Sequence, residues 1–362
     1  RETYVLRTAV TSSRSQTGMS YFPLSVEFEE KFYATGQILG SRFQRREGRP
    51  SEGATLSARI VDRTIRPLFN HGIRNEIQVV VTVLSAGEDD PDVLGVIGAA
   101  LALSVSEIPW DGPVGSVRIG KRRETGALVI NPTYPEREAG ILAYEVLACG
   151  QSGTINMIET AGFEVSESEI IEALTEAIAI NTQIEEFQRK IVAEIGKEKR
   201  VIDIAGLSDE VHALFESDAR EKLVNALFSN RSGKTHLYEV KDLWLATLAE
   251  KFPEADKGLA SEHFEHEIDV ELHKGIIHTK VRPDGRGMDD VRELYAQAGG
   301  ISPVLHGSGI FYRGETHIFS ALTLGGPDDS QILDSIEEDG TKKIFMHHYN
   351  FPPYSVGETG RI

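Results

Sequence analysis

The chain has 362 residues, enough for two or three domains, since single hydrophobic cores stop growing well before this length. Its 40% hydrophobic, 26% charged and 7% aromatic residues are typical of a soluble globular protein. The net charge of −18 argues against broad, nonspecific nucleic-acid binding, because the summed field repels phosphates. No stretch approaches the roughly 20 apolar residues of a membrane span, so we expect no membrane partner.

Residues 1–160 alternate short β-branched runs with loops around one small-residue helix at Val93 to Val105. The strand-like runs include Tyr4 to Thr11, Ile77 to Leu84 and Ala143 to Cys149. The pattern predicts an α+β domain. Arg1 begins a strand-like run with neither the basic start nor the apolar stretch of a signal peptide, so we expect a cut N-terminus.

The sequence of residues 161–278 predicts an all-helical middle domain. From Ser166 to about Lys199, apolar residues recur at helical spacing, with acidic residues in the opening turns. Helix formers continue from 207 to 278 with few β-branched runs and little turn punctuation.

Residues 279–362 return to strands after Val281-Arg-Pro-Asp-Gly-Arg286, and part of this region resembles the beginning of the chain. Arg1-Glu-Thr3 and the strand after it resemble Arg313-Gly-Glu-Thr316 and the strand that follows. Downstream, Phe22-Pro-Leu-Ser-Val26 is echoed by Phe351-Pro-Pro-Tyr-Ser-Val356. Two matches in the same order indicate a duplicated domain whose second copy has barely started at Ile362.

Four arginines lie in the segment Arg42-Phe-Gln-Arg45-Arg46-Glu-Gly-Arg49-Pro50. Their planar guanidinium groups suit phosphate recognition in a loop punctuated by Gly and Pro. Ion pairs with Glu47 and Glu52 on a solvated loop are the alternative.

Other polar residues are expected to be structural. The run Arg59-Ile-Val-Asp62-Arg63-Thr-Ile-Arg66 favours ion pairing with Asp62 on a helix. Cys149 is expected to be a small buried strand residue. The adjacent His347 and His348 would point to opposite faces if they lie on a strand, and a structural role is expected for them. No metal-ligand spacing, phosphate loop or dinucleotide fingerprint is found, so no metal site is expected in this chain.

Several long motifs resemble bacterial and organellar polynucleotide phosphorylases. They are Lys31-Phe-Tyr-Ala-Thr-Gly36, Phe43-Gln-Arg-Arg-Glu-Gly-Arg-Pro-Ser-Glu52, Arg63-Thr-Ile-Arg-Pro-Leu-Phe69, Arg282-Pro-Asp-Gly-Arg286 and His348-Tyr-Asn-Phe-Pro-Pro-Tyr-Ser-Val-Gly-Glu-Thr-Gly360. The resemblance implies an RNase PH-like core (ribosomal protein S5 domain 2-like) at 1–160, a helical domain at 161–278 and a partial second core at 279–362.

The resemblance also implies an activity, which is processive 3′-to-5′ phosphorolysis of single-stranded RNA in mRNA degradation and RNA processing. It implies Mg²⁺, inorganic phosphate as co-substrate, a homotrimer, partners in an RNA-degradation complex, and a cytoplasmic location that the lone Cys149 also suits. A noncatalytic RNA-binding or scaffold subunit and a hydrolytic relative are the alternatives.

By motif match, Arg45, Arg46 and Arg49 fall on the loop that grips RNA, although Gln44 stands where the family usually has a second Phe. Arg286 falls on an active-site arginine of the second core. Bracing that core through Asp284 or Asp290 is its alternative role.

The first core departs from the family at the positions that bind phosphate and metal in an active core. The paired serines fall at Pro91 and Asp92, the two aspartates near Arg137 and Ala143, and the metal-site lysine near Glu145. An aspartate at a helix N-terminus repels phosphate where a hydroxyl would bind it. We therefore expect a noncatalytic, RNA-guiding first core, with the main catalytic residues beyond Ile362.

Overall fold

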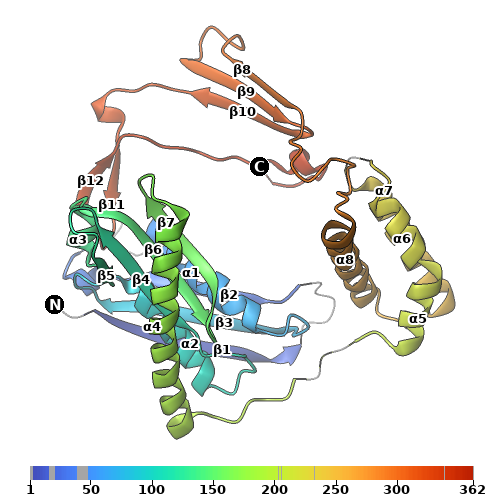
Figure 1. Ribbon diagram of the computed structural model, residues 1–362, viewed down its shortest axis with the longest axis horizontal. Coiled ribbons are helices and arrows are strands. Elements are labelled where there is room, and N and C mark those ends of the chain that lie inside the picture. The colour runs from blue at the N-terminus through green and yellow to red at the C-terminus, as the bar shows by residue number, and fades with distance from the viewer. Residues whose placement is uncertain are drawn as a thin grey trace. The chain divides into compact units, whose positions relative to one another are not determined.

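The computed structural model describes residues 3–15, 21–38, 48–202, 204, 206–231, 233–337 and 339–361. These residues form two compact units, one that runs to Asp290 and one that begins at Val291. The α+β class expected from the sequence is confirmed, since strands and helices mix in the first part, helices follow, and strands return after Val291 (Figure 1).

The first sheet has three strands in the order β1-β3-β2. β1 (Tyr4–Ser15) runs antiparallel to β3 (Asn75–Ser85), whereas β2 (Leu24–Glu30) runs parallel to it. Helices α1 (Glu52–Ile65) and α2 (Pro91–Val105) pack against this sheet and against each other. Alternate residues of β3 are buried, as in a strand with one face on a core. These residues are Ile77, Val79, Val81 and Val83.

Small residues let α2 approach the sheet closely. A Cβ on Gly98 would lie 2.0 Å from Cδ of Arg7, and one on Gly95 would lie 2.8 Å from the ring of Phe28. No side chain fits at these two positions without displacing its neighbour. The run of small residues in the sequence is therefore a packing requirement of this helix.

The second sheet has four antiparallel strands in the order β5-β4-β6-β7. Its strands are β4 (Gly115–Arg122), β5 (Leu128–Ile130), β6 (Leu142–Gln151) and β7 (Thr154–Gly162). The short helix α3 (Tyr134–Glu138) connects β5 to β6. The inward face of this sheet is apolar; it includes Val117, Ile119, Val146 and Ala148.

Helix α4 (Glu167–Ile195) forms where the apolar periodicity predicts it, and it packs against β4 and β6. Its buried stripe begins with Ala173 and Ala177, which let the helix lie close to the strands. Although α4 begins the proposed 161–278 region, its packing partners are strands of the first core.

Further along α4, two buried amides bond to backbone groups of the core. Asn181 donates through Nδ2 to the carbonyl of Ala148 at 3.2 Å. Gln188 donates through Nε2 to the carbonyl of Val114 at 2.7 Å. Because a buried carbonyl without a partner is costly, these bonds fix the position of α4 along the sheet.

The next segment is helical, as predicted. It contains α5 (Asp209–Asp218), α6 (Arg220–Leu227), α7 (Thr235–Lys251) and α8 (Lys257–Lys274), followed by a π-helical turn at Gly275–Thr279. These helices share an apolar core of their own. Its largest side chains are Phe215, Leu223, Trp244, Leu248 and Phe264.

The second unit contains a three-stranded antiparallel meander and a hairpin. The meander joins β8 (Leu294–Ala298), β9 (Gly307–Arg313) and β10 (Thr316–Leu322) in the order β10-β9-β8. The hairpin joins β11 (Gln331–Asp334) to β12 (Asp339–Lys343). The division of the chain at 160 and 278 remains a proposal.

The two resembling segments have matching local structure, but part of the predicted register is wrong. Residues 22–26 run into strand β2, so they do not correspond to the segment that ends at Val356. The matching turns are instead the 3₁₀ turns Phe32–Thr35 and Pro353–Val356. Each ends at a left-handed glycine, Gly36 with φ 77° and ψ 15° and Gly357 with φ 77° and ψ 16°. The similarity after Thr3 and Thr316 holds, since both begin edge strands, β1 and β10.

Candidate functional site

The arginine-rich segment is described only from Gly48 onward, so Arg42, Arg45 and Arg46 lie outside the described residues. Arg49 is exposed. Its guanidinium is therefore open to an anionic ligand from solvent, as a phosphate contact requires.

Directly after Arg49, Ser51 attaches the segment to the first core. Its Oγ accepts a hydrogen bond from the backbone N–H of Ala54 at 2.9 Å and so caps helix α1. The same hydroxyl donates to Oε2 of Glu30, at the end of β2, at 2.7 Å. The end of the arginine-rich segment is thus held at a fixed place beside the first sheet.

The second basic run is structural, as the sequence predicts. Arg66 binds both carboxylate oxygens of Asp62, at 2.8 and 2.6 Å, and donates to the carbonyl of Leu24 at 3.0 Å. Arg63 pairs with Glu159 at 2.5 Å on the surface. These arginines join α1 to the two sheets.

Three carboxylates and two arginines meet around the N-terminus of α2, and we call them the first-core cluster: Asp90, Asp92, Arg118, Arg137 and Glu145. Asp90 caps the helix, since its Oδ1 accepts from the backbone N–H of Asp92 at 2.9 Å. Arg118, on β4, pairs with Asp90 at 2.5 Å, with Asp92 at 3.6 Å and with Glu145 at 3.5 Å. The side chains of Asp90 and Arg118 are only 2% and 7% exposed, so this pair is shielded from water.

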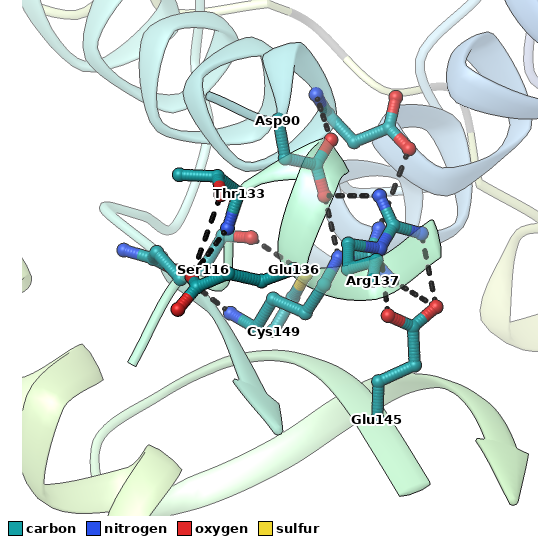
Figure 2. Close-up of polar contacts among 10 residues, drawn as sticks. Asp90, Ser116, Thr133, Glu136, Arg137, Glu145 and Cys149 are labelled. Atoms are coloured by element: carbon teal, nitrogen blue, oxygen red, sulfur yellow. Dashed lines mark hydrogen bonds and ion pairs between the residues drawn. The ribbon is translucent and has the colours of Figure 1, made fainter. Parts of the chain in front are cut away.

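Arg137, on α3, closes the cluster from the other side. It donates to both oxygens of Glu145, at 2.6 and 2.9 Å, and lies 3.6 Å from Asp90 (Figure 2). A capping box at the start of α3, in which Glu136 accepts from the backbone N–H of Thr133 at 3.1 Å, holds the turn that carries Arg137. Each charge in the cluster therefore has an opposite charge beside it.

Burial and pairing act against each other in this cluster. Burial raises the pKa of Glu145, but hydrogen bonds from Arg137 and the charge of Arg118 outweigh it and hold that pKa below its ordinary value. Burial lowers the pKa of Arg137, but Glu145 and Asp90 raise it by a larger amount, so the net shift is upward. Both groups are therefore charged at neutral pH.

The cluster occupies the positions at which the family resemblance implies phosphate and metal ligands. Asp92, Arg137 and Glu145 come together as the comparison of cores expects, whereas Ala143 offers no ligand atom. The carboxylates at the N-terminus of α2 repel an anion, and Arg137 occupies both oxygens of Glu145. These residues do not fit a phosphate or a Mg²⁺ ion. Among the described residues, no three His, Cys, Asp or Glu side chains are arranged to hold a metal.

Sequence reasoning missed Asp90 and Arg118. The signal for Asp90 was present, since an aspartate directly before a proline is typical of a helix start. Arg118 carries no such signal, because it is a charged residue that becomes buried on the face of β4 opposite Val117 and Ile119.

Arg286 lies in a loop that bonds largely to itself. Its Nε and Nη2 contact Oδ2 of Asp284 at 2.8 and 2.7 Å, and its Nη1 donates to the carbonyl of Asp290 at 3.0 Å. Arg282 donates to the same carbonyl at 3.0 Å. The guanidinium of Arg286 therefore has a fixed orientation. This orientation fits a structural role in bracing the loop, and it also fits a group that is oriented in advance to bind an anion.

Cys149 is fully buried on β6, as predicted. Burial raises the pKa of its thiol to about 11, and the thiol donates to Oγ of Ser116 at 3.3 Å. His347 and His348 are both exposed and neither lies on a strand, so the condition for opposite-facing side chains is not met.

Breaking the cluster should destabilise the first core strongly. We expect Arg118→Ala to lower the free energy of unfolding by roughly 3–5 kcal/mol, because it leaves Asp90 buried beside fewer cations. Arg63→Ala is the matched control, since its pair with Glu159 is about half exposed and should contribute less than about 1 kcal/mol. Urea denaturation at neutral pH measures both. Equal losses would contradict a special role for the buried pair.

Acid should weaken the cluster through Glu145. Because the folded-state pKa of Glu145 is lowered, its contribution is fully present above its ordinary value of 4.5 and is lost as the pH falls through the folded value. We therefore expect the wild-type protein to lose more stability than Glu145→Gln on acidification below pH 4.5. Parallel stability curves for the two proteins, measured by urea denaturation at several pH values, would contradict this assignment.

Known proteins resemble parts of this chain. Residues 2–109 match the 3′ exoribonuclease family, domain 1 (RNase PH). A crystal structure of rice (Oryza sativa) Rrp46 superposes on 53% of this chain, and the match includes 84% of the Rrp46 chain. The sequence identity is 15% and the TM-score is 0.43. Of the helices described, none is both long and apolar enough to span a membrane.

Curated relatives match almost the whole chain. Polyribonucleotide nucleotidyltransferases of Heliobacterium modesticaldum and Streptococcus gordonii are 41% and 40% identical, each over 99% of this chain. The chain spans about half the length of these relatives, 50% in both cases. Residues 2–109 thus match domain 1 of the 3′ exoribonuclease family, and nearly the whole chain is similar to about half of a polyribonucleotide nucleotidyltransferase.

Proposed function

We propose that this protein acts as a polyribonucleotide nucleotidyltransferase, which shortens RNA processively from its 3′ end by phosphorolysis and releases nucleoside diphosphates. The observation that carries the proposal is the similarity to proteins of that name along 99% of this chain, at 41% identity. The match of residues 2–109 to a 3′ exoribonuclease family supports the direction of degradation. Degradation and processing of mRNA are the proposed roles.

In this reaction an oxygen of inorganic phosphate attacks the phosphorus of the last phosphodiester. The bond from that phosphorus to the 3′ oxygen of the preceding nucleotide breaks, and this oxygen takes up a proton. Negative charge gathers on both phosphates, so fixed cations stabilise the transition state. Mg²⁺ is the proposed metal and would neutralise part of this charge when bound.

Arg286 is the proposed active-site residue of this chain. Its planar guanidinium can bind two phosphate oxygens at once, which a single ammonium group cannot do in the same geometry. The bonds to Asp284 and to the carbonyl of Asp290 support the proposal, because they orient the group before a ligand arrives.

Residues 1–160 are proposed to guide RNA rather than to cleave it. The first-core cluster supports this, because its charges neutralise one another and leave no group for phosphate. Arg45, Arg46 and Arg49 are the proposed RNA contacts. The exposure of Arg49 and the attachment of Ser51 to Glu30 fit that role.

The proposal extends to assembly and location. Single-stranded RNA is the proposed polymer ligand, and a homotrimer with partners in an RNA-degradation complex is the proposed assembly. The proposed compartment is the cytoplasm, where a single free thiol such as Cys149 stays reduced.

A noncatalytic RNA-binding or scaffold subunit is the second candidate. It is favoured by one observation, which is that the first-core cluster replaces a ligand site with internal ion pairs. The two candidates differ in whether RNA is consumed.

Product identity tests the proposed reaction. With a labelled oligoribonucleotide, Mg²⁺ and inorganic phosphate, the full-length protein purified from its source should release nucleoside diphosphates only when phosphate is present. Arg286→Lys should reduce this release by about a hundredfold, because it keeps the charge but loses the paired N–H donors. Arg231→Lys, at another exposed arginine, is the control and should leave the rate unchanged. Monophosphates made without phosphate would identify a hydrolase, and intact RNA would favour the binding subunit.

The arginine-rich segment should contribute most of the salt-dependent RNA affinity. We expect the combined change Arg45→Ala, Arg46→Ala and Arg49→Ala to weaken binding of single-stranded RNA and to flatten its dependence on salt, because fewer counterions are released. Fluorescence anisotropy at several salt concentrations measures both effects. Arg63→Ala, which removes a surface arginine paired with Glu159, is the control. Unchanged affinity of the triple variant would remove these arginines from the RNA path.

A further inference from the structure

Three aromatic rings form a row across the sheet of the second unit. Tyr295 on β8 lies opposite Tyr312 on β9, which in turn lies opposite His317 on β10. The ring centroids of the two tyrosines are 5.5 Å apart, and their ring planes are inclined by 34°. The centroids of Tyr312 and His317 are 4.0 Å apart, and their ring planes are inclined by 32°. The three rings therefore lie next to one another in one line across the sheet, which we call the aromatic row.

The aromatic row is both exposed and oriented. Tyr295 and Tyr312 are 49% and 36% exposed, and His317 is exposed as well. The hydroxyl of Tyr295 donates to Oε1 of Gln297, two residues along the same strand, at 2.7 Å. Phe319 follows His317 on the same face of β10 and is 59% exposed. Large rings held open to solvent on a sheet are a means of binding flat apolar groups.

The internal resemblance between β1 and β10 indicates which face of this sheet stays open. When Thr3 is matched to Thr316, Arg7 corresponds to Ser320, and in the first core Arg7 packs against Gly98 of α2. His317 and Phe319 fall on the opposite face of the strand. The equivalent face of β1 carries Thr8 and Val10, both exposed, and Val10 is 56% exposed. The aromatic row thus lies on the face that is open in the first core at Thr8 and Val10, the residues of β1 where its exposure is described.

The sheet that carries the aromatic row repels a polyanion less than the rest of the chain does. Residues 291–325 contain two arginines and two glutamates, so this sheet lacks the strong negative charge of the whole chain. Its exposed Arg313 lies on the face of β9 opposite Tyr312, so the row itself offers rings rather than cations. Exposed rings of this kind match the chemistry of single-stranded nucleic acid, which stacks its bases on aromatic side chains.

We propose that the aromatic row Tyr295, Tyr312 and His317 binds nucleobases of single-stranded RNA by stacking. This inference rests on the proposed function, since it takes RNA as the polymer that the protein handles. It adds a base-stacking site on the second unit to the phosphate contacts of the arginine-rich segment. The contact tolerates any base sequence, because every base has a π face.

Removing one ring of the aromatic row should lower RNA affinity without changing its salt dependence. We expect Tyr312→Ala to weaken binding of an oligoadenylate by about tenfold, while Tyr312→Phe, which keeps the ring, binds as the wild type does. Phe311→Ala is the matched control, since Phe311 is the neighbouring aromatic residue of β9, is 39% exposed and points to the opposite face. The wild type should also prefer the oligoadenylate to an abasic ribose-phosphate chain of equal length, and Tyr312→Ala should lose that preference.

Several outcomes would overturn the inference. Equal binding by Tyr312→Ala and the wild type would do so, as would equal losses in Tyr312→Ala and Phe311→Ala. A change in the oligomeric mass of Tyr312→Ala, measured by sedimentation with RNA affinity unchanged, would identify the row as a protein interface instead. If the arginine variants lose RNA and Tyr312→Ala does not, only this inference fails. If the wild type binds no RNA at all, the proposed function fails with it.

Discussion

Mutual neutralisation of the buried charges around the N-terminus of α2 is the constraint on which the first core depends. Asp90 and Arg118 are almost completely buried, and an isolated buried charge costs several kcal/mol. Their pairing is possible only if α2 and β4 hold these two residues side by side. Arg137 and Glu145 extend the same requirement to α3 and β6. One electrostatic condition therefore links α2, which packs on the first sheet, to α3 and to two strands of the second sheet.

The same condition decides what the first core can bind. A helix N-terminus attracts anions, but here its positive end faces Asp90 and Asp92. Arg118 and Arg137 already form ion pairs with these carboxylates and with Glu145. Because the charged groups of the cluster bind one another, none of them is open to a ligand. The arginines that contact RNA must therefore lie elsewhere. Arg49 and Arg313 are exposed arginines outside this cluster.

The packing of α4 follows a related principle. Its apolar residues are spread over much of its surface, yet the stripe that meets the sheet is made of two alanines and then amides. The amides are buried because the carbonyls of Val114 and Ala148 need donors. Backbone hydrogen bonding thus selects the contact face where apolar character alone would not, and it ties a helix of the proposed middle region to the first core.

The sequence by itself determined the α+β class, the extent of α2 and α4, the helical stretch after residue 207, and the structural roles of Cys149 and Arg66. Each of these depends on local periodicity, capping or a partner within four residues. Only the tertiary structure decided that Asp90 meets Arg118, that Arg137 meets Glu145 beside them, and that the rings of Tyr295, Tyr312 and His317 form one row. The partners in these groups belong to different strands and helices, and their meeting depends on strand order and register. The wrong register of the internal repeat has a related cause, because short sequence similarity does not specify the backbone path.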